Sequence, residues 1–378
     1  DPDNDPLSTK WLIDGEDISH EPEHSTKLSE GDHSIALKVS DGKSEAMRSA
    51  TVTVQPDQIY PTRPLHVKFK GVCYLTGMPQ WNNASPSEDE MNEHLEVIHN
   101  ELGCNGIRIA GYYDDDVLRC ASLAIEKGFE CIQLDPRYLD CNHQDTVERL
   151  GAFAEKAEEL RQRTDTIQLQ VANELCLDSL GIWNGESYVE RATSGWVGVP
   201  ETTWRSKLQS LLLDLVKVSR RKFGGLISYA SGFWEADAVP WEHFDVIGVN
   251  AYVQTKDGWT EDVVASKLNN LKKYSKPVYI TEFGCATYAG AGKYGGSGWF
   301  PSYCSGSPYD EDEQANYYRR YLDLINQVGV YGCSPYVFSE VYADDEVRST
   351  RFFSMINNAT KSRKKSFYAY KSYQRELP

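Results

Sequence analysis

The 378-residue sequence has no stretch that approaches 18 consecutive apolar residues, so we expect no segment to insert into a membrane as a helix. It also has no long basic run, and its net charge is −17. A chain with this charge balance is a poor partner for phosphate backbones and for anionic membrane surfaces. We therefore expect no nucleic-acid partner, and a neutral or cationic ligand is easier to accommodate.

Three motifs of hydrolytic or metal chemistry are also missing. The sequence has no Gly-x-Ser-x-Gly elbow for a nucleophilic serine and no His-Glu-x-x-His for zinc. None of its nine cysteines falls in a Cys-x-x-Cys pair, which is the usual signature of a structural zinc site. We expect no metal and no cofactor.

Cysteine usage and glycosylation motifs bear on the compartment. Nine cysteines and two acceptor sequons, at Asn83 and Asn358, favour an oxidising compartment in which disulfide bonds form. Because the cysteine count is odd, at least one thiol stays outside any disulfide within the chain. These features predict a secreted glycoprotein.

The chain is expected to have two parts, of which residues 1–57 are the first. Apolar and polar residues alternate in "HSIALKVSDGKSEAMRSATVTVQ", and Asp-Gly turn signals separate the runs. This pattern predicts short antiparallel strands in a small all-β, immunoglobulin-like sandwich. The segment resembles PKD-type and other immunoglobulin-like modules, through "DPDNDPLSTKWLIDGE", "GDHSIALKVSDG" and "ATVTV", and such modules are usually spacers or adhesive units. Residues 58–65 are proline-rich and predict a stiff linker.

The second part, residues 66–378, alternates β-rich and helical segments. Eight β-rich segments are expected at 66–75, 106–111, 130–136, 167–175, 226–232, 245–252, 277–284 and 332–339. Amphipathic helical patterns lie at 87–103, 115–128, 145–163, 204–224, 261–275, 311–329 and 364–377, and only the connection from the fifth to the sixth strand lacks a full helix. This count predicts an α/β fold, a (β/α)8 barrel. A doubly wound open sheet is the alternative, but it would more often carry a glycine-rich phosphate loop after its first strand.

In a (β/α)8 barrel the functional residues stand at the C-terminal ends of the strands. Two glutamates occupy such ends, Glu174 after the fourth strand and Glu282 after the seventh. These strands are nearly opposite, so the two carboxyl groups can converge over the barrel axis. Glycosidic cleavage requires such a pair, because one carboxyl group protonates the leaving oxygen while the other stabilises or attacks the oxocarbenium carbon. Their separation decides between retention and inversion, and the sequence leaves that separation open.

The segments around these glutamates carry a family resemblance. "VANELC" and "ITEFGC" resemble the signature of clan A glycoside hydrolases, a group of retaining (β/α)8 enzymes. The resemblance implies that Glu174 is the general acid/base and Glu282 the nucleophile, and that Asn173 bonds the 2-hydroxyl of the sugar. "GIRIAG" and "VNAY" extend the resemblance, and it implies that Arg108 keeps the nucleophile ionised and that Tyr252 hydrogen-bonds it.

Two further resemblances and two departures accompany this signature. The barrel resembles a bacterial family labelled abortive phage infection proteins, through "ELGCNGIRI", "FGGLISYAS", "FDVIGVNAY" and "KPVYITEFGCATYAGAGKYGGSGW", but that label describes no chemistry. "ITEFGC" and "ANE" are more loosely similar to fungal cell-wall glucanosyltransferases. The chain departs from clan A at Leu175, where a proline commonly follows the acid/base, and at strand eight, where "YVFSEV" offers Phe338 in place of the usual tryptophan.

Further candidates for substrate binding come from loops and strand ends at the same face. Sugars pack their C–H faces on aromatic rings, and six tryptophans fall in predicted loops there. They are Trp81, Trp183, Trp196, Trp234, Trp259 and Trp299, of which Trp183, Trp234 and Trp299 are the first candidates. Three polar strand-end residues complete the set, namely Asn250, Asp135 and Glu340. Such acids also form ordinary salt bridges in barrels.

The sequence therefore predicts a retaining glycoside hydrolase that acts on an oligo- or polysaccharide by a two-glutamate double displacement. Its expected partner is a carbohydrate, a glucan or another cell-wall glycan. Two alternatives stay open. One is a transglycosylase of the glucanosyltransferase kind, and the other is a carbohydrate-binding barrel whose glutamates are catalytically inactive.

Overall fold

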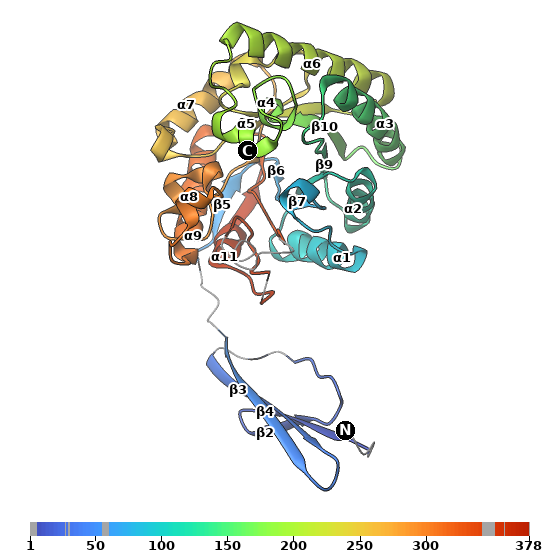
Figure 1. Ribbon diagram of the computed structural model, residues 1–378, viewed down its shortest axis with the longest axis vertical. Helices are drawn as coiled ribbons and strands as arrows, with labels where there is room; N and C mark the ends of the chain where they lie inside the picture. The colour runs from blue at the N-terminus through green and yellow to red at the C-terminus, as the bar shows by residue number, and fades with distance from the viewer. Residues whose placement is uncertain are drawn as a thin grey trace. The chain divides into compact units, whose positions relative to one another are not determined.

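Figure 1 shows the computed structural model of the chain, which describes residues 6–26, 28, 31–54, 60–341, 352–358 and 360–377. The chain divides into two compact units, residues 1–59 and residues 60–378. Among the described residues, no helix combines the length and the apolar composition that a bilayer crossing needs.

The first unit is a four-stranded antiparallel sheet with the strand order β2-β1-β3-β4. Its strands are β1 (Ser8–Ile13), β2 (Glu16–Ser19), β3 (Gly31–Ser40) and β4 (Glu45–Val54). Asp14 and Gly15 join β1 to β2, and both have positive φ, as a tight hairpin turn requires. The predicted all-β character is confirmed. The described residues of this unit form one sheet, so the facing sheet of a sandwich is not among them, and the PKD-type resemblance stays a prediction.

The second unit contains a closed barrel of parallel strands. Its sheet has the order β6-β14-β13-β12-β11-β10-β9-β8-β7. β6 (Phe69–Lys70) and β7 (Cys73–Leu75) are two halves of the first predicted strand, yet they stand at opposite ends of this order. The sheet therefore closes on itself, because β6 pairs with β14 (Gly332–Cys333) and β7 pairs with β8 (Gly106–Gly111). The predicted (β/α)8 barrel is confirmed.

The remaining barrel strands are β9 (Cys131–Pro136), β10 (Ile167–Asn173), β11 (Ile227–Gly232), β12 (Val246–Asn250) and β13 (Val278–Glu282). Every strand is buried over its whole length, as expected for parallel strands between the barrel interior and a layer of helices. The prediction for strand eight is too long. β14 ends at Cys333, and Pro335, which has no N–H to donate, follows where the predicted strand would continue.

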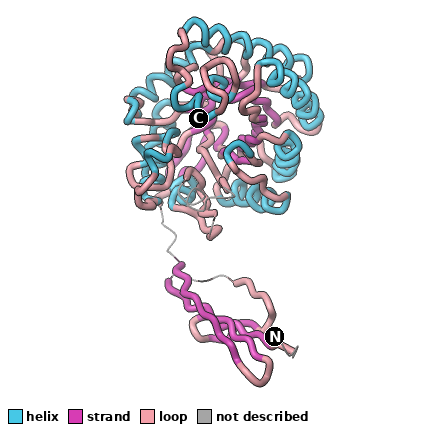
Figure 2. Tube along the Cα trace, viewed as in Figure 1, coloured by secondary structure: helices cyan, strands magenta, loops and turns pink. Residues whose placement is uncertain are grey.

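Helices surround the strands of this unit, drawn in cyan around magenta in Figure 2. The longer ones are α1 (Glu88–Glu96), α2 (Asp114–Lys127), α3 (His143–Arg161), α6 (Glu201–Lys222), α7 (Glu261–Leu271) and α9 (Glu311–Val328). The start of α1 illustrates local control: Ser87 accepts from the Glu90 N–H at 3.2 Å, while Glu90 accepts from the Ser87 N–H at 3.1 Å. This is a capping box. As predicted, β11 and β12 are joined without a full helix, through two 3₁₀ turns, Ala236–Ala238 and Trp241–His243.

The C-terminal segment differs from its prediction. The helix predicted over 364–377 ends early, as α11 (Lys365–Lys371), and Tyr373–Glu376 forms β15. β15 pairs in parallel with β5 (Arg63–His66), so main-chain bonds to a distant segment replace the last helical turns. The same pairing shortens the predicted linker 58–65. Residues 58 and 59 lie outside the described chain, while the Leu65 side chain is fully buried within the barrel unit.

Neither sequence feature that favoured an oxidising compartment finds support. All nine cysteines lie in the described barrel unit, most of them buried, and none forms a disulfide. Asn83 is 5% exposed and its Nδ2 donates to the Val341 carbonyl at 3.1 Å, while Asn358 is 9% exposed and its Nδ2 donates to the Glu340 carbonyl at 2.5 Å. A glycan attaches at this nitrogen, so the fold does not support glycosylation at either residue. Secretion stays a prediction.

Candidate active site

A cleft of about 1210 Å³ lies at the carboxyl ends of the barrel strands. Both strand-end glutamates line it, together with Asn173 at the end of β10 and Tyr252 after β12. The volume exceeds the roughly 300–1,000 Å³ of ordinary small-molecule sites. The cleft therefore suits a ligand larger than one sugar unit.

Glu282 ends β13 with a hydrogen-bond donor on each carboxylate oxygen. Arg108 Nη1 donates to Oε1 at 2.7 Å, and the Tyr252 hydroxyl donates to Oε2 at 2.8 Å. Two donors, one of them cationic, are the surroundings of an ionised carboxylate. The chain leaves the strand end through Gly284, whose φ is +148°, and a Cβ there would lie 2.8 Å from the Tyr336 carbonyl oxygen. Glycine is therefore required beside this glutamate.

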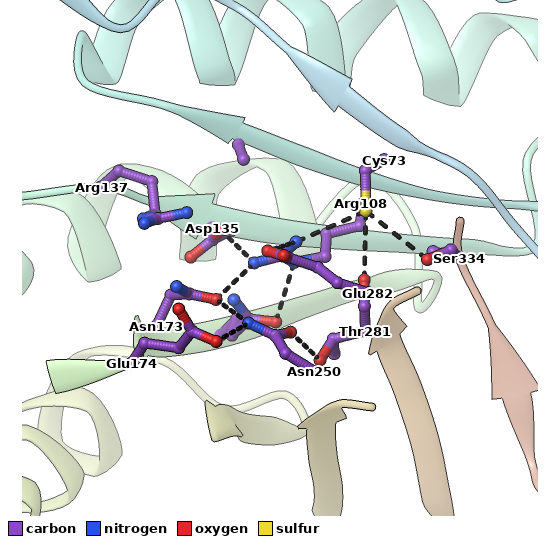
Figure 3. A network of polar contacts seen from close by, with 12 residues as sticks. Cys73, Arg108, Asp135, Arg137, Asn173, Glu174, Asn250, Thr281, Glu282 and Ser334 are labelled. Carbon is purple, nitrogen blue, oxygen red and sulfur yellow. Dashed lines mark hydrogen bonds and ion pairs between the residues drawn. The ribbon is translucent and has the colours of Figure 1, made fainter. Parts of the chain in front are cut away.

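Arg108, on β8, is the centre of the polar network beneath the cleft (Figure 3). Its Nη2 donates to Asp135 Oδ2 at 2.7 Å and to Asn173 Oδ1 at 2.9 Å, in addition to the Nη1 bond to Glu282. Its Nε donates to Gln170 at 3.2 Å. The side chain is fully buried; burial disfavours the cation, but the charges of Asp135 and Glu282 outweigh that and raise the pKa of Arg108 well above its ordinary value.

Glu174 directly follows β10 and has quite different surroundings. It is 8% exposed, and Asn250 Nδ2 donates to its Oε1 at 2.9 Å. Thr281 Oγ1 donates to Asn250 Oδ1 at 2.7 Å, which fixes the direction in which that amide points. Burial, and then the charge of Glu282, raise the pKa of Glu174 well above its ordinary value. The surroundings of the two carboxyl groups thus differ: Glu282 receives a guanidinium and a phenol donor, whereas burial and the charge of Glu282 favour the acid form of Glu174.

The backbone at Glu174 is unusual. Its φ of 36° and ψ of 55° place it in the left-handed region, immediately before the short helix α4 (Leu175–Asp178). Leu175 donates its N–H to the Tyr229 hydroxyl at 2.8 Å, and Cys176 donates its N–H to Glu235 Oε2 at 3.1 Å. A proline at position 175, which is common in clan A, has no N–H and could not make the first of these bonds.

The structure separates the predicted polar residues into two layers. Asn173, Glu174, Tyr252 and Glu282 line the cleft. Arg108, Asp135 and Asn250 do not, because they lie beneath it and contact one another or the lining residues. Arg108 bonds Glu282 as the clan A resemblance implies, and Asp135 and Asn250, candidates for substrate binding, bond to residues of the network from below the cleft. Glu340 does line the cleft, but its Oε1 accepts from the backbone N–H groups of Phe353 at 2.5 Å and Ser354 at 3.1 Å.

All six predicted loop tryptophans line the cleft, and Trp204 joins them. Trp234 stacks on Trp259 with ring centroids 6.2 Å apart and planes 17° apart. Trp183 packs edge-on against Trp196 at 5.8 Å. In the described part of the chain the indole nitrogens of Trp183 and Trp234 are buried and have no hydrogen-bond partner. The walls therefore offer flat apolar faces, while these two N–H groups are buried and not exposed to a ligand in the cleft.

Sequence reasoning chose the wrong aromatic residue at strand eight. Phe338 is buried away from the cleft, against Tyr74 at 6.4 Å and His94 at 5.2 Å, and Tyr336 lines the cleft instead. In a continuous strand, residues 336 and 338 would share one face. The segment leaves the ladder after Cys333, so that alternation no longer applies.

Two other residues of the cleft are not among the predicted site residues. Arg137 lines the cleft and pairs with Asp178 at 2.8 and 3.0 Å, and its guanidinium lies 5.5 Å from the Trp81 ring centre. Tyr188, from α5 (Tyr188–Ser194), lines the cleft near Trp81. Among the described residues, no group of three His, Cys, Asp or Glu side chains is arranged to hold a metal ion.

Comparison with known proteins gives one family match and several structural ones. The model of Glycoside Hydrolase Family 113 matches residues 201–333, which is less than half of the chain; this range contains Glu282 but not Glu174. The fold is similar to that of a Family 113 β-1,4-mannanase, with 15% identity, coverage of 82% of this chain and 98% of that one, and a TM-score of 0.53. It is also similar to a β-glucuronidase from Bacteroides uniformis, with 13% identity, coverage of 97% and 46%, and a TM-score of 0.55.

A Family 113 β-mannanase from Alicyclobacillus acidocaldarius has 14% identity, with coverage of 81% of this chain and 96% of that one and a TM-score of 0.50. At these identities the structural likeness shows the fold alone. No curated protein matches the chain. These matches do not bear on the resemblance to abortive phage infection proteins, which stays a prediction. Together, the family match and the (β/α)8 fold support a glycoside hydrolase.

Proposed function

We propose that the protein is a retaining glycoside hydrolase in which Glu282 is the nucleophile and Glu174 the general acid/base. The observation that carries this proposal is the contrast between the two carboxyl groups. Glu282 receives a guanidinium donor and a phenol donor, whereas Glu174 is buried with a single amide donor. A retaining enzyme needs this division of protonation states before substrate binds.

The reaction assigns each group one task in each step. Glu174 delivers its proton to the glycosidic oxygen while a Glu282 oxygen attacks the anomeric carbon, so the glycosidic bond breaks as an ester bond to Glu282 forms. Glu174, now a carboxylate, then takes a proton from water as the water oxygen displaces Glu282. Arg108 and Tyr252 bind the carboxylate before the first step and after the second.

Asn173 is oriented for the sugar ring. Its Oδ1 accepts from Arg108 at 2.9 Å and from Asn250 at 3.0 Å, which directs its Nδ2 group away from the network. Since Asn173 lines the cleft at the end of β10, directly before Glu174, this amide group supplies a donor for a sugar hydroxyl. This geometry supports the predicted bond to the 2-hydroxyl.

The substrate that fits the cleft best is a neutral polysaccharide. Among the described lining residues the carboxylates are Glu174, Glu201, Asp257, Glu282 and Glu340, and the cations are Arg137 and Lys256. Arg137 is already bonded to Asp178 through two nitrogens. A uronic acid would add a negative charge to this surface without a free partner, whereas a neutral chain uses the indole faces.

The test is a product analysis across a panel of glycosides. Wild type, Glu282→Gln and the control Glu242→Gln are assayed on aryl β-mannosides, β-glucosides and β-glucuronides, and on neutral mannans and glucans, with product configuration followed by NMR. Glu242 is a suitable control because its side chain is 67% exposed in the loop after β11. We expect turnover of a neutral glycan with retained configuration by wild type and control, and none by Glu282→Gln.

A 2-deoxy-2-fluoro aryl glycoside of the accepted sugar should label the protein once, and peptide mass analysis should locate the label on Glu282. Inverted product would contradict the nucleophile assignment, because Glu282 would then act on water. Products longer than the substrate would identify transglycosylation. Binding of oligosaccharides without turnover anywhere in the panel would show that the protein is a carbohydrate-binding barrel and not a hydrolase.

A further inference from the structure

The turn that presents Glu174 is held from behind by two side chains outside the cleft. Leu175 and Cys176 begin α4, and their N–H groups have no partner within so short a helix. The Tyr229 hydroxyl accepts from Leu175 at 2.8 Å, and Glu235 Oε2 accepts from Cys176 at 3.1 Å. The Tyr229 hydroxyl in turn donates to Glu235 Oε1. Glu235 thus ties both N–H groups into one unit.

The side chains of Tyr229 and Glu235 are both buried from solvent and packed in the protein interior. Tyr229 belongs to β11 and is fully buried, with its ring 6.3 Å from those of Trp241 and Phe244. Glu235 is also fully buried, and the 3₁₀ turn that follows it is anchored by the bond from the Ala238 N–H to the Glu235 carbonyl at 2.8 Å. Neither residue lines the cleft. Neither can therefore contact substrate, and any effect on the reaction must pass through Glu174.

A buried carboxyl group is a costly choice for a purely structural position. Glu235 accepts hydrogen bonds from the Tyr229 phenol and the Cys176 backbone amide, and both donors are neutral. Burial raises the pKa of Glu235 to about 7, against the hydrogen bonds from Cys176 and Tyr229. Its charge also reaches the site, since Glu235 follows burial and Glu282 among the influences that raise the pKa of Glu174.

We propose that Glu235, acting with Tyr229, is the positioning residue of Glu174: it fixes the left-handed turn that aims the acid/base into the cleft and places a negative charge behind it. This inference rests on the proposed function for the role of Glu174. The left-handed conformation of a non-glycine residue is one that the surroundings must hold in place. Here Glu235 and Tyr229 supply those surroundings.

Besides Tyr229, several charged and titratable groups surround Glu174 and influence its pKa. They come from five elements or loops and comprise Glu282 on β13, Tyr252 after β12, Glu235 after β11, Cys176 and Asp178 in α4, and Tyr188 in α5. The Glu235 carboxyl group bonds to the turn through the Cys176 N–H, whereas the Asp178 carboxylate is bonded to Arg137. Replacing Glu235 by glutamine keeps the shape, removes the charge and should lower the pKa of Glu174.

The experiment compares wild type, Glu235→Gln, Tyr229→Phe and the matched control Glu242→Gln. Two aryl glycosides of the accepted sugar are used, one with a poor leaving group that needs proton donation and one with an activated leaving group that does not. We expect kcat/KM on the poor leaving group to fall by about ten- to a hundredfold in both network variants, because misplacing a catalytic group by about 1 Å has that effect. On the activated leaving group it should change by less than about threefold.

In Glu235→Gln the alkaline limb of the kcat/KM profile should also move to lower pH, while Glu242→Gln should leave both the limb and the two rates unchanged. Equal losses on both leaving groups, or an unmoved alkaline limb in Glu235→Gln, would overturn the proposal and leave Glu235 a structural residue. If Glu235→Gln fails to fold, Tyr229→Phe still tests the proposal, because this substitution removes only one oxygen atom from the core.

A second readout separates this inference from the proposed function. The Glu174 carboxyl group is titrated by ¹³C NMR, with its signal assigned by its disappearance in Glu174→Gln. If wild type hydrolyses no glycoside, the proposed function fails, yet a Glu174 pKa that falls in Glu235→Gln still supports the coupling. An unchanged Glu174 titration refutes the coupling even in an active enzyme.

Discussion

Removal of the Arg108 guanidinium should destabilise the barrel strongly. The side chain is fully buried and bonds to Glu282 and Asp135, both at 2.7 Å. In Arg108→Met both carboxyl groups lose this cation in a place that water does not reach. Breaking a buried ion pair by removing one partner costs about 3–5 kcal/mol, so the free energy of unfolding at pH 7 should fall by about that amount.

The loss should depend on pH in a definite direction. Burial already raises the pKa of Asp135 while Arg108 lowers it, so without Arg108 that pKa rises further. A carboxyl group whose pKa is higher in the folded than in the unfolded state stabilises the fold below its unfolded pKa and loses this contribution as pH rises through the folded pKa. Arg108→Met should therefore recover stability relative to wild type as the pH falls from 7 to 5.

Urea unfolding followed by tryptophan fluorescence is the assay, because eight of the nine tryptophans lie in the barrel unit. The control is Arg119→Met, since Arg119 is 43% exposed and pairs with Asp116 at 3.0 Å on the surface of α2. Its loss should stay below about 1 kcal/mol. A loss below about 1 kcal/mol for Arg108→Met as well, unchanged between pH 5 and 7, would refute the reasoning that this network is a desolvated ion cluster.

Three further predictions concern the cleft. Gly284→Ala should lower the free energy of unfolding by about 1–3 kcal/mol, because the φ of +148° disfavours a side chain and the new Cβ would meet the Tyr336 carbonyl 2.8 Å away; an unchanged urea midpoint would contradict this. Trp234→Ala should raise KM for an oligosaccharide by about tenfold, or 1.4 kcal/mol, through loss of the face stacked on Trp259, while kcat on a short aryl glycoside changes little; an unchanged KM would exclude the stack from binding. Finally, kcat/KM should fall as pH rises through the raised pKa of Glu174, and this limb should vanish in Glu174→Gln on an activated leaving group; its persistence would assign the limb to another group.

The parts of the fold that the sequence predicts are those in which local pattern and long-range packing agree. Buried parallel strands are continuous apolar runs, and β8 occupies the residues predicted for it. The two glutamates were found because barrel strand ends are where polar residues have a use. The end of the chain was mispredicted because Tyr373–Glu376 is stabilised by pairing with β5, about 300 residues away, which no local pattern reports.

Whether a site residue lines the cleft or lies beneath it could not be predicted from the sequence either. Asp135 and Asn250 stand at strand ends like Asn173, yet they lie beneath the cleft, because the side on which a side chain emerges depends on the register of neighbouring strands. Glu235 was not predicted as a site residue, for another reason. It stands in a connection without a full helix, and its partner N–H belongs to Cys176, 59 residues earlier in the chain. The sequence around it, "GFWEADAVPWE", also contains Asp237 and Glu242, so it does not single out Glu235.

The departure from clan A at position 175 and the network behind Glu174 explain each other. A proline there would restrict the residue before it and would leave no N–H to bond. Leu175 keeps that N–H, and Tyr229 accepts from it at 2.8 Å while donating to Glu235. A proline at 175 would favour an extended Glu174, whereas the hydrogen-bonded network holds Glu174 at a φ of 36° and also places the Glu235 carboxyl group behind the turn. Leu175→Pro should therefore remove the bond to Tyr229 and favour an extended backbone at Glu174, while the Cys176 N–H can still donate to Glu235.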